Sequence, residues 1–354
     1  MINLMVGNNF DEKLPETLIE LNRKNKDKGI RINEVFGSIR SLDVIQSARP
    51  PFRVPDVSLE VFKKINLSLR EAGITVNYTI NTPLTDHTKL DEGVIKEFMA
   101  MLVEEYFVNR VTVAHPLLMK VISKVSSVPI EISTIYRVKH PRQLYDLKEM
   151  APNINKVCAD VYTNRNGALL RELTKHAKKL NIQFELLANE FCIDQCAVRD
   201  QCYHAHVVNK TIDDTKKFGA WPMGYCIGHR EQDPAEWLYA NFILPQHMKI
   251  YQDIFDIDSF KITGRTAPTK YLSWIIEQYM NKNFDGNLLE LWQDVKNISR
   301  VEKGIEDFIP PKYEIKTNPL DINFLLPFLK DQQIPYDDEK KHVIEFLGKT
   351  LVNK

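Results

Sequence analysis

The stretch from residue 75 to residue 113 contains three patterned segments. They are Thr75–Ile80 (TVNYTI), Lys89–Phe107 (KLDEGVIKEFMAMLVEEYF) and Arg110–Val113 (RVTV). The first and last of these segments are short, apolar and rich in β-branched residues, as buried strands are. The middle segment carries its apolar side chains at helical spacing, so it predicts an amphipathic helix that packs on the core. A strand, a helix and a second strand in succession predict two parallel strands joined by a right-handed crossover.

The same alternation extends along the chain to about residue 280. The strand candidates are Ile2–Val6, Arg31–Val35, Thr75–Ile80, Arg110–Val113, Ile130–Ser133, Lys156–Tyr162, Gln183–Leu187 and Ser259–Ile262. The helix candidates include Ser58–Ala72, Lys89–Phe107, Leu117–Ser126, Gly167–Leu180 and Thr269–Met280. About eight strand–helix units match a (β/α)8 barrel of the TIM type, regular or irregular, which takes ~250 residues. A doubly wound open sheet is the alternative, and it is disfavoured because no G-x-G-x-x-G fingerprint follows the first strand.

We expect two parts in the chain. Residues 1–283 form the TIM-type barrel, with a cysteine-bearing insertion at 189–230, and residues 284–354 form a small, mostly helical C-terminal extension. The extension is predicted from a change of pattern after Asp285, where helical segments alternate with a proline-rich, turn-rich stretch. Its segments are the helical patterns Asn287–Asn297, Ile322–Lys330 and Asp338–Leu347 and the breaks at Ile309-Pro310-Pro311 and Asn318-Pro319.

Composition narrows the class of protein. Lys+Arg and Asp+Glu balance at 47 each, so no net field draws the chain toward nucleic acid or an anionic membrane. No stretch approaches the ~20 apolar residues of a membrane helix, and the N-terminus lacks the basic start and the apolar length of a signal peptide. We therefore expect a cytoplasmic protein without membrane contact or general nucleic-acid binding. In the cytoplasm thiols stay reduced, so clustered cysteines indicate metal binding or redox chemistry.

Four of the five cysteines lie between positions 192 and 226, as Cys192-x3-Cys196-x5-Cys202 and then Cys226. They begin directly after a predicted strand and belong to a loop too long for an ordinary barrel connection. Three interpretations are open: ligands of an iron–sulfur cluster, ligands of zinc, or small buried side chains. In a zinc site the alternates are His204, His206 and His229. The fifth cysteine, Cys158, stands in an apolar strand candidate and is assigned to the core.

In a barrel, the active site lies at the carboxyl ends of the strands. This rule selects the polar residues that end or follow each strand candidate, some of which serve as caps and turn formers. They are Glu34, Ser38, Arg40, Asn77, Tyr78, Asn81, His115, Thr134, Tyr136, Asn164, Arg165, Asn189, Glu190, Lys261 and Arg265.

Several of these motifs together resemble the collagenase-like peptidase family U-32 over about residues 1–282. They are Asn189-Glu190-x-Cys192-x3-Cys196-x2-Arg199, the later Cys226, Phe260-Lys261-Ile262-x-Gly264-Arg265, Gly37-Ser38 through Ala48-Arg49-Pro50, and Asn77–Asn81. The resemblance implies a barrel, a four-cysteine iron–sulfur cluster, and oxygen-independent hydroxylation of ubiquinone precursors or RNA bases. The ligands would be Cys192, Cys196, Cys202 and Cys226. The family patterns His-Gly-x2-Cys and Ser-Gly-x-Cys are absent, which indicates a divergent branch.

Three functions follow as hypotheses. The first is a 4Fe-4S protein, with zinc as the alternative metal, that modifies a small molecule without oxygen. Its candidate catalytic residues are Glu190, Lys261, Arg265, Asn77 and Tyr78, and its lysine and arginine would bind a carboxylate. The second is a peptidase acting on peptides, although His-Glu-x2-His and Gly-x-Ser-x-Gly motifs are absent. The third is a non-catalytic, metal-stabilised partner subunit. A homodimer or a heterodimer with a related subunit would be compatible with each of the three functions.

Overall fold

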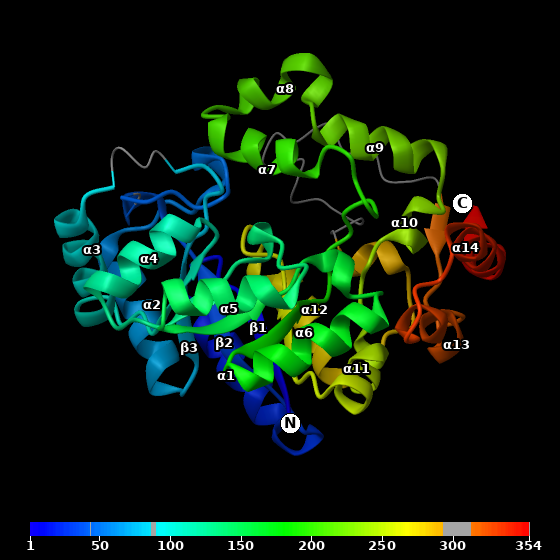
Figure 1. Cartoon of the computed structure of the whole chain (residues 1–354), viewed down its shortest axis with the longest axis horizontal. Coiled ribbons are helices and arrows are strands. Elements are labelled where there is room, and N and C mark those ends of the chain that lie inside the picture. The colour runs from blue at the N-terminus through cyan, green and yellow to red at the C-terminus, as the bar shows by residue number, and fades with distance from the viewer. Residues whose placement is uncertain (43, 86–89, 293–312, 354) are drawn as a thin grey trace.

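The computed structural model describes residues 1–42, 44–85, 90–292 and 313–353. Its centre is a closed barrel of parallel strands in the order β1 to β8 (Figure 1). The TIM-type prediction is therefore confirmed. The strands are β1 (Ile2–Gly7), β2 (Ile30–Gly37), β3 (Thr75–Ile80), β4 (Arg110–Val113), β5 (Ile130–Ile132), β6 (Ile154–Cys158), β7 (Gln183–Leu187) and β8 (Ser259–Ile262).

Three strands, β1, β2 and β5, differ from the predicted bounds by one or two residues at an end, and the largest error concerns β6. The apolar run Lys156–Tyr162 was assigned to a strand, but β6 starts earlier and ends at Cys158. The chain then turns into a short 3-10 helix, Val161–Thr163, because the Asp160 side chain accepts a hydrogen bond from Tyr162 N and caps it.

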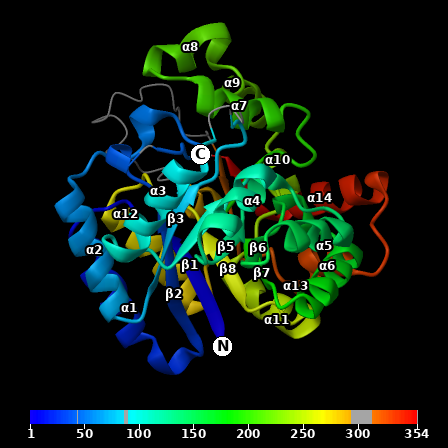
Figure 2. The same ribbon diagram turned by 60° about the vertical axis from the view of Figure 1, so that its left-hand side comes forward.

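Helices surround the barrel, with their apolar faces on the strands (Figures 1 and 2). Ser58 caps α2 by accepting a hydrogen bond from Val61 N at 3.2 Å, and Gly73 follows that helix with φ 72°, as its C-terminal turn requires. The outer helices are α1 (Leu14–Lys24), α2 (Leu59–Glu71), α3 (Glu92–Glu104), α4 (Pro116–Val125), α5 (Pro141–Met150), α6 (Gly167–Lys179), α11 (Met248–Phe255) and α12 (Thr269–Asn281).

The cysteine-bearing insertion is helical. It contains α7 (Arg199–Val208), α8 (Ile212–Ala220), α9 (Met223–Gln232) and α10 (Glu236–Tyr239). In Figure 1, α7, α8 and α9 form a layer above the barrel, on the side opposite the N-terminus. We call this layer, residues 189–232, the cysteine lobe. Since β7 leads directly into it, the cysteine lobe lies over the carboxyl ends of the strands.

The C-terminal extension packs beside the barrel. It contains α13 (Ile322–Leu325), a 3-10 turn (Leu326–Leu329), α14 (Tyr336–Thr350) and the antiparallel pair β9 (Tyr313–Ile315) and β10 (Leu351–Asn353). The Arg165 guanidinium stacks on Phe324 and Phe328 at 4.9 and 5.1 Å, which joins the extension to the loop after β6. Of the predicted helix Asn287–Asn297, the described part forms a 3-10 turn, Leu288–Leu291. The rest of that helix and Ile309-Pro310-Pro311 lie outside the described residues.

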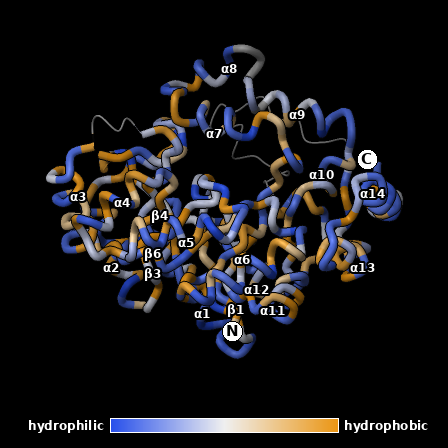
Figure 3. The backbone as a smooth tube through the Cα atoms, in the orientation of Figure 1, coloured by the Kyte–Doolittle hydropathy of each residue, from blue (hydrophilic) through white to orange (hydrophobic). Residues whose placement is uncertain are grey.

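Hydrophobic positions gather along the strands, whereas α14 is largely hydrophilic (Figure 3). In the described ranges, no helix has both the length and the apolar character needed to cross a bilayer.

Candidate functional site

The barrel interior holds a layer of charged and polar side chains. Lys156 Nζ lies 2.9 Å from Glu34 Oε2 and 2.5 Å from Glu185 Oε1, and all three side chains are fully buried. Lys261 Nζ pairs with Glu131 Oε1 at 2.8 Å. A buried ionic layer at the centre of a barrel is costly unless each charge has a partner, so these pairs define the strand arrangement around them.

Asn77 links the two halves of this layer. Its Nδ2 donates to Glu34 Oε1 at 2.8 Å and to Glu131 Oε2 at 2.6 Å, and its Oδ1 accepts from Thr112 Oγ1 at 2.8 Å. At the lower edge, Arg110 Nη1 lies 2.5 Å from Glu34 Oε2. Asn77 thus acts as a bridge inside the barrel.

Sequence reasoning selected Glu34, Asn77 and Lys261 but missed Glu131, Lys156 and Glu185. The missed signal was a charged residue in an otherwise apolar strand, which in a barrel points inward to partners on other strands. Tyr78 lies on the opposite face of β3 from Asn77. Its hydroxyl donates to the carbonyls of Ile39 and Leu42 at 3.3 and 3.2 Å, so the structure places it in the core between barrel and helices.

Glu185 makes the buried layer sensitive to pH. Burial raises the pKa of this carboxyl to about 7; Lys156 opposes the shift and Glu131 adds to it. Because its folded-state pKa lies above the ordinary 4.5, the folded protein binds this proton more tightly than the unfolded chain does. The resulting stability is fully present below that ordinary value and is lost as pH rises through the folded pKa.

We therefore expect Glu185→Gln to flatten the fall in stability between about pH 5 and about pH 8. Urea unfolding at several pH values measures this, with exposed Glu172→Gln on α6 as the control that keeps the wild-type profile. A Glu185→Gln profile as steep as that of the wild type would contradict the assignment.

Above the ionic layer, Arg265 closes the barrel mouth. It is 6% exposed, and its Nη1 donates to Thr79 Oγ1 at 2.6 Å. Burial, and next the charge of Arg49, lower the pKa of its guanidinium well below the usual range. Lys261, which was predicted to bind a substrate carboxylate together with Arg265, instead forms an ion pair with Glu131.

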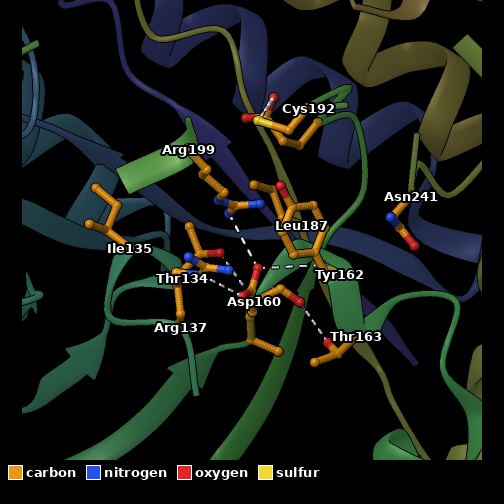
Figure 4. A network of polar contacts seen from close by, with 12 residues as sticks. Thr134, Ile135, Arg137, Asp160, Tyr162, Thr163, Leu187, Cys192, Arg199 and Asn241 are labelled. Atoms are coloured by element: carbon orange, nitrogen blue, oxygen red, sulfur yellow. Dashed lines mark hydrogen bonds and ion pairs between the residues drawn. The ribbon is translucent and has the colours of Figure 1, made fainter. Parts of the chain in front are cut away.

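Asp160 anchors the cysteine lobe on the barrel (Figure 4). This fully buried carboxylate follows β6 and lies 3.0 Å from Arg137 Nε and 3.3 Å from Arg199 Nη2. Arg199 begins α7 and stacks on the ring of Tyr162 at 4.5 Å. Sequence reasoning missed Asp160 and Arg137, although an aspartate directly after a strand was the available signal.

The four cysteines of the lobe are half-buried and none is in a disulfide. Cys192 Sγ donates to Glu190 Oε1 at 3.5 Å, and the Cys196 backbone N–H donates to Tyr162 Oη at 3.0 Å. Cys202 Sγ lies 3.8 Å from His206 Nε2. Cys192 and Cys196 lie in the loop before α7, Cys202 lies in the first turn of α7, and Cys226 lies in α9.

The charges of these cysteines and of Glu190 act on one another. Burial, and next the charges of Cys226, Glu190 and Cys196, raise the pKa of Cys202 to about 12. Burial also raises the pKa of Cys192 well above its usual range, with contributions from Glu190 and Cys202. Burial likewise raises the pKa of Cys226, so it favours the protonated form of Cys192, Cys202 and Cys226.

Cys158 is fully buried in β6, which confirms its assignment to the core. The histidines are dispersed. His204 and His206 lie on α7, where residues two apart do not share a face, and His204 is exposed. His229 packs on Tyr225 with ring centroids 4.3 Å apart.

Comparisons with known proteins bear on this arrangement. No family model matches the chain. A curated relative, the uncharacterized protease MJ1657 of Methanocaldococcus jannaschii, is 29% identical over 140 residues, which cover 38% of this chain. The match supports the U-32 family. It spans 39% of the relative's length, well under half of that protein.

Solved structures with a similar barrel include the U32 peptidase Mk0906. It has 12% identity and a TM-score of 0.49, and the alignment covers 75% of this chain and 92% of that chain. A D-psicose 3-epimerase has 8% identity and a TM-score of 0.37, with 59% and 83% covered.

A 4Fe-4S cluster is held by four cysteine thiolates. Across the described ranges, no three His, Cys, Asp or Glu side chains are already arranged around one metal position. The four lobe cysteines nevertheless match such a group in number and kind, because none of them is in a disulfide and the charges of Cys196 and Cys226 act on Cys202. Metal binding displaces the protons of these thiols, and Arg199 lies close enough to favour the resulting negative charge on Cys192.

Proposed function

We propose that this chain is a U-32-type iron–sulfur protein that performs an oxygen-independent hydroxylation, or a related redox modification, of an organic substrate. The observation that carries the proposal is the set of four cysteines, none in a disulfide, in the cysteine lobe over the carboxyl ends of the barrel strands. Cys192, Cys196, Cys202 and Cys226 would hold a 4Fe-4S cluster. When bound, the cluster would supply electron transfer or a Lewis-acidic iron.

The residues of this chain would prepare the site in three ways. Arg137 and Asp160 fix the position of Arg199, and therefore of α7. Arg199 would offset negative charge on the thiolates. Glu190, which accepts the Cys192 hydrogen bond, lies where a proton could be held between the cysteine lobe and the barrel mouth.

Anaerobic purification tests the proposal. We expect about four irons and about four acid-labile sulfides per chain, with a broad visible absorbance that dithionite bleaches. Stoichiometric zinc without sulfide or visible absorbance would overturn the redox proposal in favour of a zinc site. The protein should be expressed with iron supplied, so that low occupancy is not produced by the medium.

A peptidase is the second candidate, because the curated relative is named a protease. Cleavage of denatured collagen or a quenched fluorescent peptide library by protein stripped of iron would support it. Cleavage that needs the iron, or no cleavage, would favour the redox proposal.

A further inference from the structure

Arg265 is held at the barrel mouth by its backbone. It follows Gly264, whose φ of 133° disfavours any side chain. A Cβ on Gly7, at the end of β1, would lie 2.5 Å from Arg265 N, so only glycine there allows the two segments to approach. The guanidinium is buried and donates to Thr79 Oγ1.

Arg49 reaches the same mouth from the loop between β2 and α2. The backbone N–H of Ala48 donates to Asn81 Oδ1 at 3.1 Å, which ties this loop to the end of β3. The same strand carries Thr79, the acceptor for Arg265. Both arginines are therefore fastened to one strand end.

The surroundings of Arg49 are polar but poor in negative charge. It lines a narrow pocket with Ser38, Ser47 and Tyr78, and the buried hydroxyl of Ser47 has no hydrogen-bond partner. The carboxylate that acts on Arg49 is Glu190, which already accepts hydrogen bonds from Cys192 and Phe191.

Neither guanidinium is neutralised within the described parts of the chain: no ion pair joins Arg49 or Arg265 to a carboxylate there. Burial lowers the pKa of both groups, and the charge of Arg49 lowers that of Arg265 further. A buried cation without an ion pair, such as Arg265, is unfavourable, and the half-buried Arg49, whose Nε has no hydrogen-bond partner, adds a second positive charge at the same mouth. An oxyanion between them would remove this cost, because guanidinium groups bind carboxylate and phosphate through paired hydrogen bonds.

We propose that Arg49 and Arg265 form an oxyanion subsite, which holds the carboxylate or phosphate of the substrate at the barrel mouth beneath the cysteine lobe. This inference rests on the proposed function for what then happens to the substrate, whereas anion binding itself does not require the cluster. Lys261 takes no part in the subsite, since Glu131 neutralises it.

The test is anion binding by the full-length, anaerobically purified protein. Inorganic phosphate and benzoate are titrated separately at constant ionic strength against chloride, with thermal unfolding and calorimetry as readouts. We expect saturable stabilisation by phosphate, benzoate or both. The more effective anion identifies the class of substrate group.

The variants Arg265→Gln and Arg49→Gln should each weaken that binding at least about tenfold. In anion-free buffer, Arg265→Gln should unfold at the wild-type temperature or above it, since an unpaired buried cation is gone. The control is Arg23→Gln, an exposed arginine on α1 paired with Glu20, which should bind as the wild type does.

Two results would overturn the subsite: no saturable binding of either anion, or wild-type binding by both variants. Should Arg265→Gln fail to fold, Arg49→Gln, on a half-buried loop position, still decides the matter. Iron and sulfide are measured in the same samples. Anion binding without a cluster would reject the proposed function while retaining the subsite.

Discussion

Replacing Cys196 with serine is expected to remove most of the iron, sulfide and visible absorbance from the anaerobically purified protein. A serine hydroxyl is a much weaker donor to iron than a thiolate, and a cluster with three remaining thiolates is easily lost. Cys196 is the most informative position for this test because the structure gives hydrogen bonds to its backbone, which serine retains: its N–H donates to Tyr162 Oη and its carbonyl accepts from the Arg199 N–H. The fold should therefore survive the change.

The matched control is Cys158→Ala, which alters the cysteine outside the lobe. Cys158 is fully buried in β6, so alanine costs some packing but leaves the four proposed ligands in place. Cys158→Ala should keep the wild-type iron content. A full cluster in Cys196→Ser, or its loss in Cys158→Ala, would show that the ligand assignment is wrong.

The barrel was predictable because each strand is a short apolar run between helical patterns. Thr75–Ile80 and Gln183–Leu187 were predicted with the bounds found in the structure. The error at β6 arose because the apolar run continues beyond the end of the strand. Val161 and Tyr162 are buried, but they lie in a 3-10 turn. Burial, which the sequence indicates well, does not distinguish a strand from a buried turn.

For the site, the sequence predicts which residues share a face within one strand, but it does not predict contacts between strands. Alternation along β3 separates Asn77 from Tyr78, so the two could not both face the barrel interior. The partners of Asn77 and Lys261 could not be inferred, because Glu131 is 54 and 130 residues away from them in the sequence. Such pairings depend on barrel closure and register, which no local pattern encodes.

Lys156→Met is expected to destabilise the protein by about 3–5 kcal/mol at neutral or higher pH. Lys156 is the cation that contacts Glu185 in the described structure, whereas Glu34 also has Arg110 and Asn77. Truncation thus leaves one buried carboxylate without a counter-charge. Urea unfolding measures the loss, and exposed Lys178→Met, paired with Asp256, should change stability by less than about 1 kcal/mol.

The double variant Lys156→Met with Glu185→Leu separates charge from packing. If the loss comes from the unpaired carboxylate, removing Glu185 as well should restore most of the stability, because a buried ion pair can often be exchanged for apolar groups at little cost. Lowering the pH should partly rescue the single variant for the same reason, since Glu185 then takes up a proton. A double variant as unstable as the single one would show that Lys156 acts through its packing against Met5, which its Nζ contacts at 3.6 Å, more than through its charge.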